Sequence, residues 1–312
     1  QESYRLDHIA YVVVGEKKLS YEEHGNLHTL YKNDHQKFID YNIKDVELVE
    51  RIDQKMGLIE LVMTMAYKAG VNYSDVMGTT AIWDSIIYRD LYANKIAPPP
   101  NVEKFKGPYP GGYVKDPHVG SHDWVVSFDL NSLYPNLIVQ YNMSPETLLK
   151  SDQGDVCIAA NGAAFTKKFQ GMLPRIIINY SNERKAIKKD MLAAMQANQN
   201  NPSSDTEREI NRLENRQMAI KILLNSLYGA LGNKYFRYFD QSVAEAITTS
   251  GQLAILTAEK AMNLEMNKIL KSDKDYVIAI DTDSLYVNFG PLVDKLKPKD
   301  IVKTLDTVCN DH

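Results

Sequence analysis

Two aspartates stand in a short turn between two apolar runs. The turn is Asp281-Thr282-Asp283-Ser284, and residues 276–280 and 285–289 flank it, which predicts two strands joined by the turn. An Asn-Gly or Asp-Gly pair would make such a turn comfortably, whereas two nearby carboxylates raise each other's pKa unless a cation neutralises them. Asp281 and Asp283 are therefore candidate metal ligands, with an ordinary polar surface turn as the alternative.

A third aspartate ends another predicted strand. Residues 124–128 are mostly apolar, and Asp129 follows them directly. If this strand is a neighbour of the other two in one sheet, Asp129 and Asp283 can bind the same divalent cations. Mg²⁺ prefers a few carboxylates together with water and phosphate oxygens, and two such ions about 3.5–4 Å apart promote in-line phosphoryl transfer. Sequence separation alone does not bring the strands together.

A basic segment could hold a polyphosphate. Residues 166–240 contain 13 Lys and Arg against 7 Asp and Glu, whereas the whole chain has a net charge of −4. Such a segment attracts phosphate groups, and cations around a polyphosphate assist phosphoryl transfer. The alternative interpretation is a solvated helical surface.

Two helices are predicted within this segment, over residues 182–199 and 205–231, with a polar loop at 198–204. Arg184 and Lys188 share one face of the first helix, and Lys221, Asn225 and Tyr228 share one face of the second. The cations could hold phosphates, and Asn225 and Tyr228 could meet a base. Two antiparallel helices joined by a short loop make a hairpin.

Other patterns predict the elements elsewhere in the chain. Residues 9–14 predict a helix or strand that ends at Gly15, and apolar spacing over residues 38–57 predicts an amphipathic helix that stops at Gly57. A further helix fits residues 58–69. Pro98-Pro99-Pro100 marks a boundary or a stiff linker, and Tyr109-Pro110-Gly111-Gly112-Tyr113-Val114 predicts a turn between extended pieces.

Length and composition exclude several classes of protein. With 312 residues, of which 44% are hydrophobic and 24% charged, the chain is neither collagen-like nor disordered, and at roughly 150 residues per domain two domains are expected. No apolar run approaches the roughly 18 residues of a membrane span, so no membrane association is expected. Cys157 and Cys309 lack metal-ligand spacing, which favours a reducing compartment. Because both ends look cut, we expect a fragment of a longer protein.

Three of these motifs resemble, in the right order, the polymerase motifs of family B DNA polymerases. They are Asp129-Leu130-Asn131-Ser132-Leu133-Tyr134-Pro135, Lys221-Ile222-Leu223-Leu224-Asn225-Ser226-Leu227-Tyr228-Gly229 and Asp281-Thr282-Asp283-Ser284. The segment 109–114 resembles the family's linker between exonuclease and polymerase regions, and Tyr41-Asn42-Ile43-Lys44-Asp45 resembles its third exonuclease motif. The resemblance covers nearly the whole chain and is greatest to the replicative polymerases of T-even-like bacteriophages. Asn136 and Ile280 depart from common family residues, which concerns the subgroup more than the activity.

The resemblance implies a catalytic and metal-binding role for the acidic residues. Asp129 and Asp283 would hold two Mg²⁺ ions, for which Mn²⁺ can substitute, and the backbone carbonyl of Leu130 would be a further ligand. Asp281 would be a neighbouring carboxylate with a supporting role in catalysis.

The resemblance also implies which residues bind the nucleotide and DNA. Backbone amides near Ser132 and Leu133 would meet the triphosphate, and Tyr134 would exclude a ribose 2′-hydroxyl. The remaining implied contacts fall into three groups: Arg184, Lys188 and Lys221 on the phosphates, Asn225, Tyr228 and Gly229 around the nascent base pair, and Tyr109, Gly111 and Gly112 on DNA.

The implied fold is α+β, with a mainly antiparallel palm sheet and a two-helix fingers insertion, and with no thumb. The expected divisions are the C-terminal part of a 3′–5′ exonuclease domain at 1–57, a connecting helical segment of the N-terminal domain at 58–107, palm at 108–152, fingers at 153–238 and palm again at 239–312. The substrates would be a DNA primer–template and a dNTP. A sliding clamp would be a partner of the full-length protein, which would be viral and act in the cytoplasm of an infected bacterium.

Tyr41 and Asp45 would be the remnant of an editing site. Such a site needs carboxylates from three exonuclease motifs, and only the third motif is present. Asp45-Val46-Glu47 matches the Asp-x-Glu of the first motif, but it lies in a predicted amphipathic helix rather than on an apolar strand. We therefore expect no proofreading activity.

Two other functions are alternatives. A reverse transcriptase is a different palm-type polymerase, but it usually carries a Tyr-x-Asp-Asp turn, which this chain lacks. The second alternative is a truncated, non-catalytic module that binds nucleotide or DNA.

Overall fold

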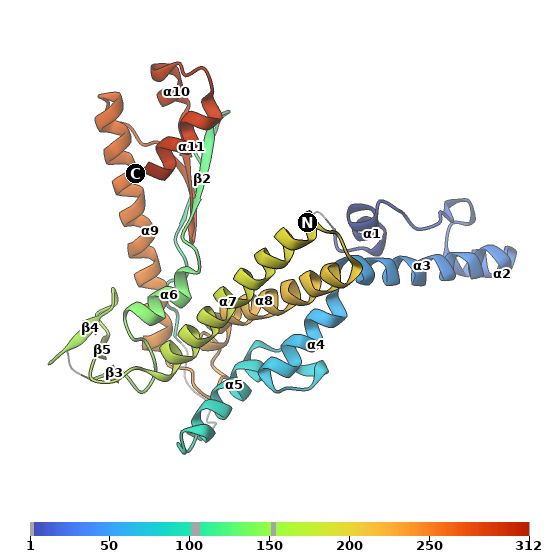
Figure 1. The fold of residues 1–312 in the computed structure, drawn as a ribbon, viewed down its shortest axis with the longest axis horizontal. Helices are drawn as coiled ribbons and strands as arrows, with labels where there is room; N and C mark the ends of the chain where they lie inside the picture. The colour runs from blue at the N-terminus through green and yellow to red at the C-terminus, as the bar shows by residue number, and fades with distance from the viewer. Residues whose placement is uncertain (1–2, 101–106, 151–153, 312) are drawn as a thin grey trace. The chain divides into compact units, whose positions relative to one another are not determined.

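The computed structural model describes residues 3–100, 107–150 and 154–311 (Figure 1). The chain divides into two compact units, the first with residues 1–68 and 187–219 and the second with residues 69–186 and 220–312. The expected boundary between residues 152 and 153 lies outside the described residues.

The first unit is built from helices. Its N-terminal part contains α1 (Leu6–Val14), the short η1 (Glu22–His24), α2 (Leu27–Asn33), α3 (His35–Met56) and most of α4 (Leu58–Ala69). These elements confirm the helices predicted over residues 38–57 and 58–69 and the predicted stop at Gly57, and of the two alternatives for residues 9–14 the structure has the helix. Gly57 has φ 61° and its N–H donates to the carbonyl of Asp53, a helix end that favours glycine. A Cβ at Gly57 would lie 3.2 Å from the amide of Asn215, so the corner packs closely against α8 (Ser204–Leu231).

Two long helices, α7 (Met172–Asn200) and α8, form the predicted hairpin. α7 begins at Met172 rather than at residue 182, because Ile176 and Ile177 are buried and packing outweighs the modest helix propensity of β-branched residues. The predicted loop at 198–204 is also shorter than expected, since α7 continues to Asn200.

The second unit contains a four-stranded antiparallel sheet. Its strands, in the order β1-β6-β7-β2, are β1 (Val114–Lys115), β6 (Val277–Asp281), β7 (Ser284–Asn288) and β2 (Val125–Asp129). They confirm the predicted strand before Asp129 and the predicted strand–turn–strand. A smaller sheet of β3 (Leu148–Leu149), β5 (Ala164–Thr166) and β4 (Val156–Ile158) has no counterpart in the sequence prediction. Helices combined with antiparallel sheets agree with the expected α+β class.

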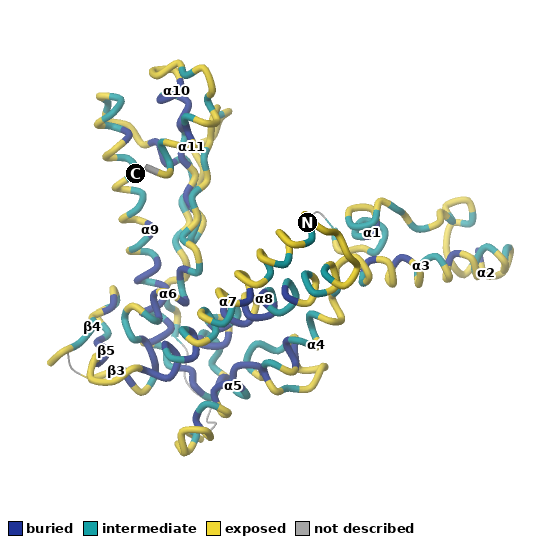
Figure 2. The backbone as a smooth tube through the Cα atoms, viewed as in Figure 1, coloured by how far each residue is buried: buried dark blue, intermediate teal, exposed yellow. Residues whose placement is uncertain are grey.

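The larger sheet is fixed by packing against α9 (Gln241–Leu270), which runs beside it in Figure 1. Ile280 and Leu285 of the sheet are buried together with Ile255 and Met266 of this helix. Because side chains alternate along a strand, the same packing leaves Asp281 exposed at the end of β6. Figure 2 shows that the first part of α9 and the neighbouring α6 (Leu133–Gln140) are largely buried.

Helix α5 (Thr79–Ala93) anchors the part of the hairpin that belongs to the second unit. Trp83 is fully buried, and its indole N–H donates to the hydroxyl of Ser226 in α8 at 3.1 Å. Arg175 of α7 pairs with Asp90 of α5, with 2.5 Å between Nη2 and Oδ2. These contacts hold the base of both long helices.

The remaining elements are the short η2 (Tyr73–Asp75), α10 (Gly290–Leu296) and α11 (Ile301–Asp311). Within the described ranges, no helix combines the length and the apolar character that a membrane crossing requires.

Candidate functional site

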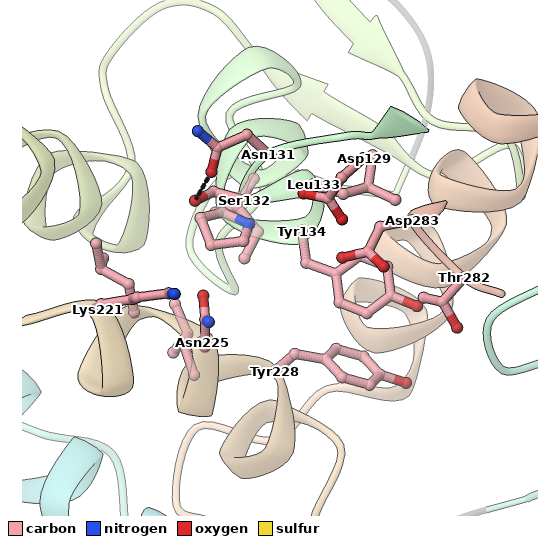
Figure 3. Close-up of a pocket in the computed structure, with 14 residues that line it drawn as sticks. Asp129, Asn131, Ser132, Leu133, Tyr134, Lys221, Asn225, Tyr228, Thr282 and Asp283 are labelled. Carbon is pink, nitrogen blue, oxygen red and sulfur yellow. Dashed lines mark hydrogen bonds between the residues drawn. The ribbon is translucent and has the colours of Figure 1, made fainter. Parts of the chain in front are cut away.

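The pairing of β2 with β7 brings two of the predicted aspartates to one end of the sheet. Asp129 lies opposite Ser284 in the antiparallel register, and the Ser284 hydroxyl donates to Asp129 Oδ1 at 3.1 Å. The N–H of Leu130 donates to the carbonyl of Asp283 at 2.8 Å. The two strands are therefore direct neighbours, and the carboxyl groups of Asp129 and Asp283 lie close together (Figure 3).

Burial and neighbouring charge both act on Asp283. Burial raises the pKa of its carboxyl group, and the negative charges of Asp129 and Asp281 raise that pKa further. Burial removes water from the ionised carboxylate, and neighbouring negative charges repel that carboxylate, so both disfavour the charged form. A cation bound here would relieve both penalties.

The turn between β6 and β7 has an uncommon backbone conformation. Thr282 has φ 56°, which is rare for a β-branched residue. Its N–H donates to the carbonyl of Tyr113 at 2.8 Å. A Cβ at Gly112 would lie 2.5 Å from Thr282 Oγ1, so glycine lets this segment approach the turn. Such a conformation persists where the surrounding structure supports it.

A second tight segment follows β2. Ser132 has φ 53° and α6 begins immediately after it. The side-chain amide of Asn136 donates to the carbonyl of Asn131 at 2.9 Å and closes the segment. This contact gives a structural role to Asn136, one of the two residues that depart from the pattern of the motifs described above. The first N–H groups of a helix have no intrahelical acceptor and favour anions, so the backbone near Ser132 and Leu133 can receive an anionic group.

A cavity of about 420 Å³ opens beside these segments (Figure 3). It is lined by residues of the second unit from three regions: Asp129, Asn131, Ser132, Leu133, Tyr134, Pro135 and Ile138; Lys221, Leu224, Asn225, Leu227 and Tyr228; and Thr282 and Asp283.

Three tyrosines pack at one side of the cavity. The rings of Tyr134 and Tyr228 have centroids 4.8 Å apart and planes tilted by 53°. Burial raises the pKa of Tyr228, and a hydrogen bond with Tyr109 raises it further. Burial also raises the pKa of Tyr134, and the negative charge of Asp283 raises that pKa further. The phenols of Tyr134 and Tyr228 are therefore neutral at physiological pH.

The predicted site residues differ in how they relate to the cavity. The cavity brings together Asp129, Ser132, Leu133, Tyr134, Lys221, Asn225, Tyr228 and Asp283. Tyr109, Gly112 and Asp281 adjoin it through contacts with Tyr228 and Thr282, and the carbonyl of Gly111 accepts a hydrogen bond from Gln252 of α9. Leu130, Arg184 and Gly229 belong to the same unit but do not line the cavity, and Lys188 belongs to the first unit.

Sequence reasoning missed two cavity residues of functional interest, Asn131 and Thr282. Thr282 stood inside a motif already chosen for its carboxylates, and no pattern reveals a positive φ at a threonine. Asn131 has a recognisable partner only when the backbone brings Asn136 to it.

The donor atoms at this end of the sheet fit a hard divalent cation. Asp129 and Asp283 offer carboxylate oxygens, which Mg²⁺ accepts as ligands. In the described part of the chain no group of three or more His, Cys, Asp or Glu is arranged to hold a metal ion. Two aspartates would thus need water or substrate oxygens to complete the coordination.

The predicted exonuclease remnant lies in the first unit. Lys18 Nζ is 2.8 Å from Asp45 Oδ2 and 4.7 Å from the centre of the Tyr41 ring. Although burial lowers the pKa of Lys18, hydrogen bonds with Asp45 and Tyr41 raise it above its ordinary value. Asp45 Oδ1 is buried and accepts no hydrogen bond from the described residues. The carboxylate is thus neutralised by a lysine of the same unit.

Comparison with known proteins identifies relatives of this chain. A family profile described as DNA polymerase family B matches residues 78–312. A DNA-directed DNA polymerase of Escherichia phage RB69 is 33% identical, over 95% of this chain and 39% of the phage protein. The DNA-directed DNA polymerase of Enterobacteria phage T4 is 32% identical, over 94% of this chain and 39% of the phage protein. DNA polymerase 1 of Pyrococcus abyssi is 35% identical, over 61% of this chain and 23% of that protein. The chain thus spans 39% of the length of either phage relative.

The substitution Asp283→Asn is expected to raise the free energy of unfolding at neutral pH in buffer containing a chelator, because an amide is not repelled by Asp129 or Asp281. A raised folded-state pKa means that the carboxylate costs stability above that pKa. The advantage of the variant should therefore shrink as the pH falls and vanish below the ordinary aspartate pKa. Urea unfolding at several pH values measures it.

The exposed Asp294 of α10 provides the control for this prediction. Asp294→Asn should change the stability little at any pH. A variant Asp283→Asn that is less stable than the parent at neutral pH would contradict the electrostatic account.

Proposed function

The chain belongs to DNA polymerase family B, and from this premise we propose that it catalyses template-directed transfer of a nucleotide from a dNTP to a primer 3′-hydroxyl, with release of pyrophosphate. The observation that carries the proposal is the register of β2 and β7, which sets Asp129 beside Asp283 at the cavity. Lys221 stands on the opposite side of the same cavity (Figure 3), so a triphosphate can extend between carboxylate-bound cations and a lysine.

In this proposal Asp129 and Asp283 hold two Mg²⁺ ions with the carbonyl of Leu130, and Mn²⁺ can substitute. When bound, the ions activate the attacking oxygen and neutralise charge on the leaving pyrophosphate. The hydroxyl of Ser284 orients the Asp129 carboxylate, and the exposed Asp281 adds negative charge beside the site. Repulsion among the three carboxylates favours the ion-bound state.

The nucleotide binds with its phosphates toward the positive groups. Lys221 contacts them from α8, and the backbone N–H groups near Ser132 and Leu133 contact them from the start of α6. We include Arg184 and Lys188 of α7 among the phosphate-binding residues on the basis of the family motif. Phosphoryl transfer depends largely on such positioning and charge neutralisation.

The sugar and base contact the other side of the cavity. Tyr134 lies beneath the sugar, where its ring leaves no room for a 2′-hydroxyl, and Asn225 and Tyr228 line the nascent base pair. Gly229 follows Tyr228 on an exposed face of α8, where a missing side chain leaves room for the base pair. The segment with Tyr109, Gly111 and Gly112, which packs against the turn and α9, binds DNA.

The proposed organisation follows the family. The larger sheet with α6 and α9 is the palm, at 108–152 and 239–312, and the hairpin of α7 and α8 is the fingers, at 153–238. Residues 1–57 are part of an exonuclease domain and 58–107 connect it to the palm. The whole protein works as a phage polymerase on a primer–template in an infected bacterium, together with a sliding clamp.

We also propose that residues 1–57 carry no editing activity. The ion pair between Lys18 and Asp45 supports this, because the lysine already neutralises the carboxylate on which a metal would depend. The ring of Tyr41 is likewise covered by the Lys18 ammonium.

Primer extension with Mg²⁺ and dNTPs tests the aspartates. Asp129→Ala and Asp283→Ala should each slow extension by about 100-fold or more, the scale on which charged groups stabilise transition states. Asp294→Ala, outside the cavity, should extend normally. Equal extension by all variants would refute the assignment, and nucleotide binding without extension by the parent would instead identify a non-catalytic nucleotide-binding module.

The substitution Tyr134→Ala should raise incorporation of ribonucleotides relative to deoxyribonucleotides by about tenfold or more, since removing a ring relieves a steric clash. Competition between ATP and dATP on one template position measures this ratio. An unchanged ratio would remove Tyr134 from sugar selection.

The purified chain should not degrade a single-stranded 3′ end. The measurement is loss of a labelled oligonucleotide in Mg²⁺, with Asp45→Ala as the matched variant. Rapid degradation that disappears in Asp45→Ala would show an active editing site.

A further inference from the structure

A buried glycine stands behind Tyr134. Gly251 lies inside α9, where glycine is less favourable than alanine. A Cβ at this position would lie 2.9 Å from Tyr134 Cε1 and 3.5 Å from Leu133 Cδ2. Real Cβ contacts essentially never come as close as 2.9 Å, so the ring occupies the space that any other residue at 251 would fill.

The helix around Gly251 is held by its neighbours. The buried Ser250 accepts a hydrogen bond from the N–H of Ala160 at 3.2 Å. The buried Thr248 donates to the carbonyl of Pro110 at 2.8 Å, and Gln252 donates to that of Gly111 at 2.7 Å. An added methyl group at 251 would therefore displace the Tyr134 ring more readily than the backbone of α9.

Neighbouring aromatic residues limit where the displaced Tyr134 ring can move. Tyr228 stands beside it with a centroid distance of 4.8 Å, and Tyr228 is itself hydrogen-bonded to Tyr109. A Cβ at Gly232 would lie 3.0 Å from the Tyr109 hydroxyl, so this chain of aromatic residues has little room to yield. The cavity, which Tyr134 lines and Gly251 does not, is open space into which the ring can move.

We propose that Gly251 is a specificity-determining positioning residue: by lacking a side chain, it sets how far the Tyr134 ring projects into the nucleotide cavity. The inference rests on the proposed function, in which the sugar lies against that ring. A methyl group at 251 drives the ring toward the sugar, so even a deoxyribonucleotide fits less well, while the carboxylates stay in place.

The test is a double-mutant cycle in steady-state primer extension by the whole chain. Gly251→Ala should raise the KM for dATP by about tenfold, the scale of one misplaced methyl-sized contact, with a much smaller change in kcat. In the Tyr134→Ala background the same substitution should leave KM unchanged, because no ring remains to be displaced.

Gly171→Ala is the matched control. A Cβ there would lie 2.8 Å from Ser144 Cβ, an equally close approach in the same unit but away from the cavity. It should lower the midpoint of thermal unfolding and leave the KM for dATP unchanged. If Gly251→Ala likewise lowers the midpoint of thermal unfolding and leaves the KM for dATP unchanged, its effect is purely structural and the proposal is wrong.

The remaining outcomes are decisive as well. If Gly251→Ala does not fold, recovery of folding by adding Tyr134→Ala supports the contact, and failure to recover overturns it. Equal KM changes in both backgrounds also overturn it. If the parent protein binds dATP but does not extend a primer, the Kd for dATP, measured by calorimetry, is compared among the same variants in place of KM. If the sugar does not contact Tyr134, the single variant Tyr134→Ala leaves the ratio of ribonucleotide to deoxyribonucleotide incorporation unchanged. This result distinguishes failure of the proposed function from failure of the Gly251 contact.

Discussion

The antiparallel register of β2 against β7 is the constraint from which the candidate site follows. It sets Asp129 opposite Ser284, and hence beside Asp283 in the adjoining turn. A shift by one residue would move every side chain of β2 to the other face of the sheet. The register is specified because Val126 and Phe128 of β2 pack against the core that contains Leu285 and Val287 of β7, and a slip of β2 would turn these two side chains away from that core.

The site combines several locally unfavourable features that the surrounding structure offsets. Carboxylates converge, and two non-glycine residues, Ser132 and Thr282, have positive φ. Hydrogen bonds from Asn136 and to Tyr113 support these conformations. Such exceptions to local preference concentrate where function requires them, and here they surround a cavity that Asp129 and Asp283 line together with Lys221.

The sequence predicts the helices and strands whose apolar residues follow a regular spacing, and it misses the features that depend on tertiary packing. The long amphipathic α3, the stop at Gly57 and the strands around Asp281 and Asp283 follow from periodicity and composition. The early start of α7 does not, because burial of its isoleucines outweighs their propensity. Neither the Lys18–Asp45 ion pair nor the approach of Tyr134 to Gly251 leaves a pattern, since each joins residues far apart in the chain.

Binding of Mn²⁺ in the presence of dNTP, followed by electron paramagnetic resonance, tests the central claim most directly. If Asp129 and Asp283 share their ions, Asp129→Asn and Asp283→Asn should each lose bound Mn²⁺ to the same extent as the double variant. If either single variant retains the binding of the parent, or if the two losses simply add, the two carboxylates serve separate sites and the account is wrong.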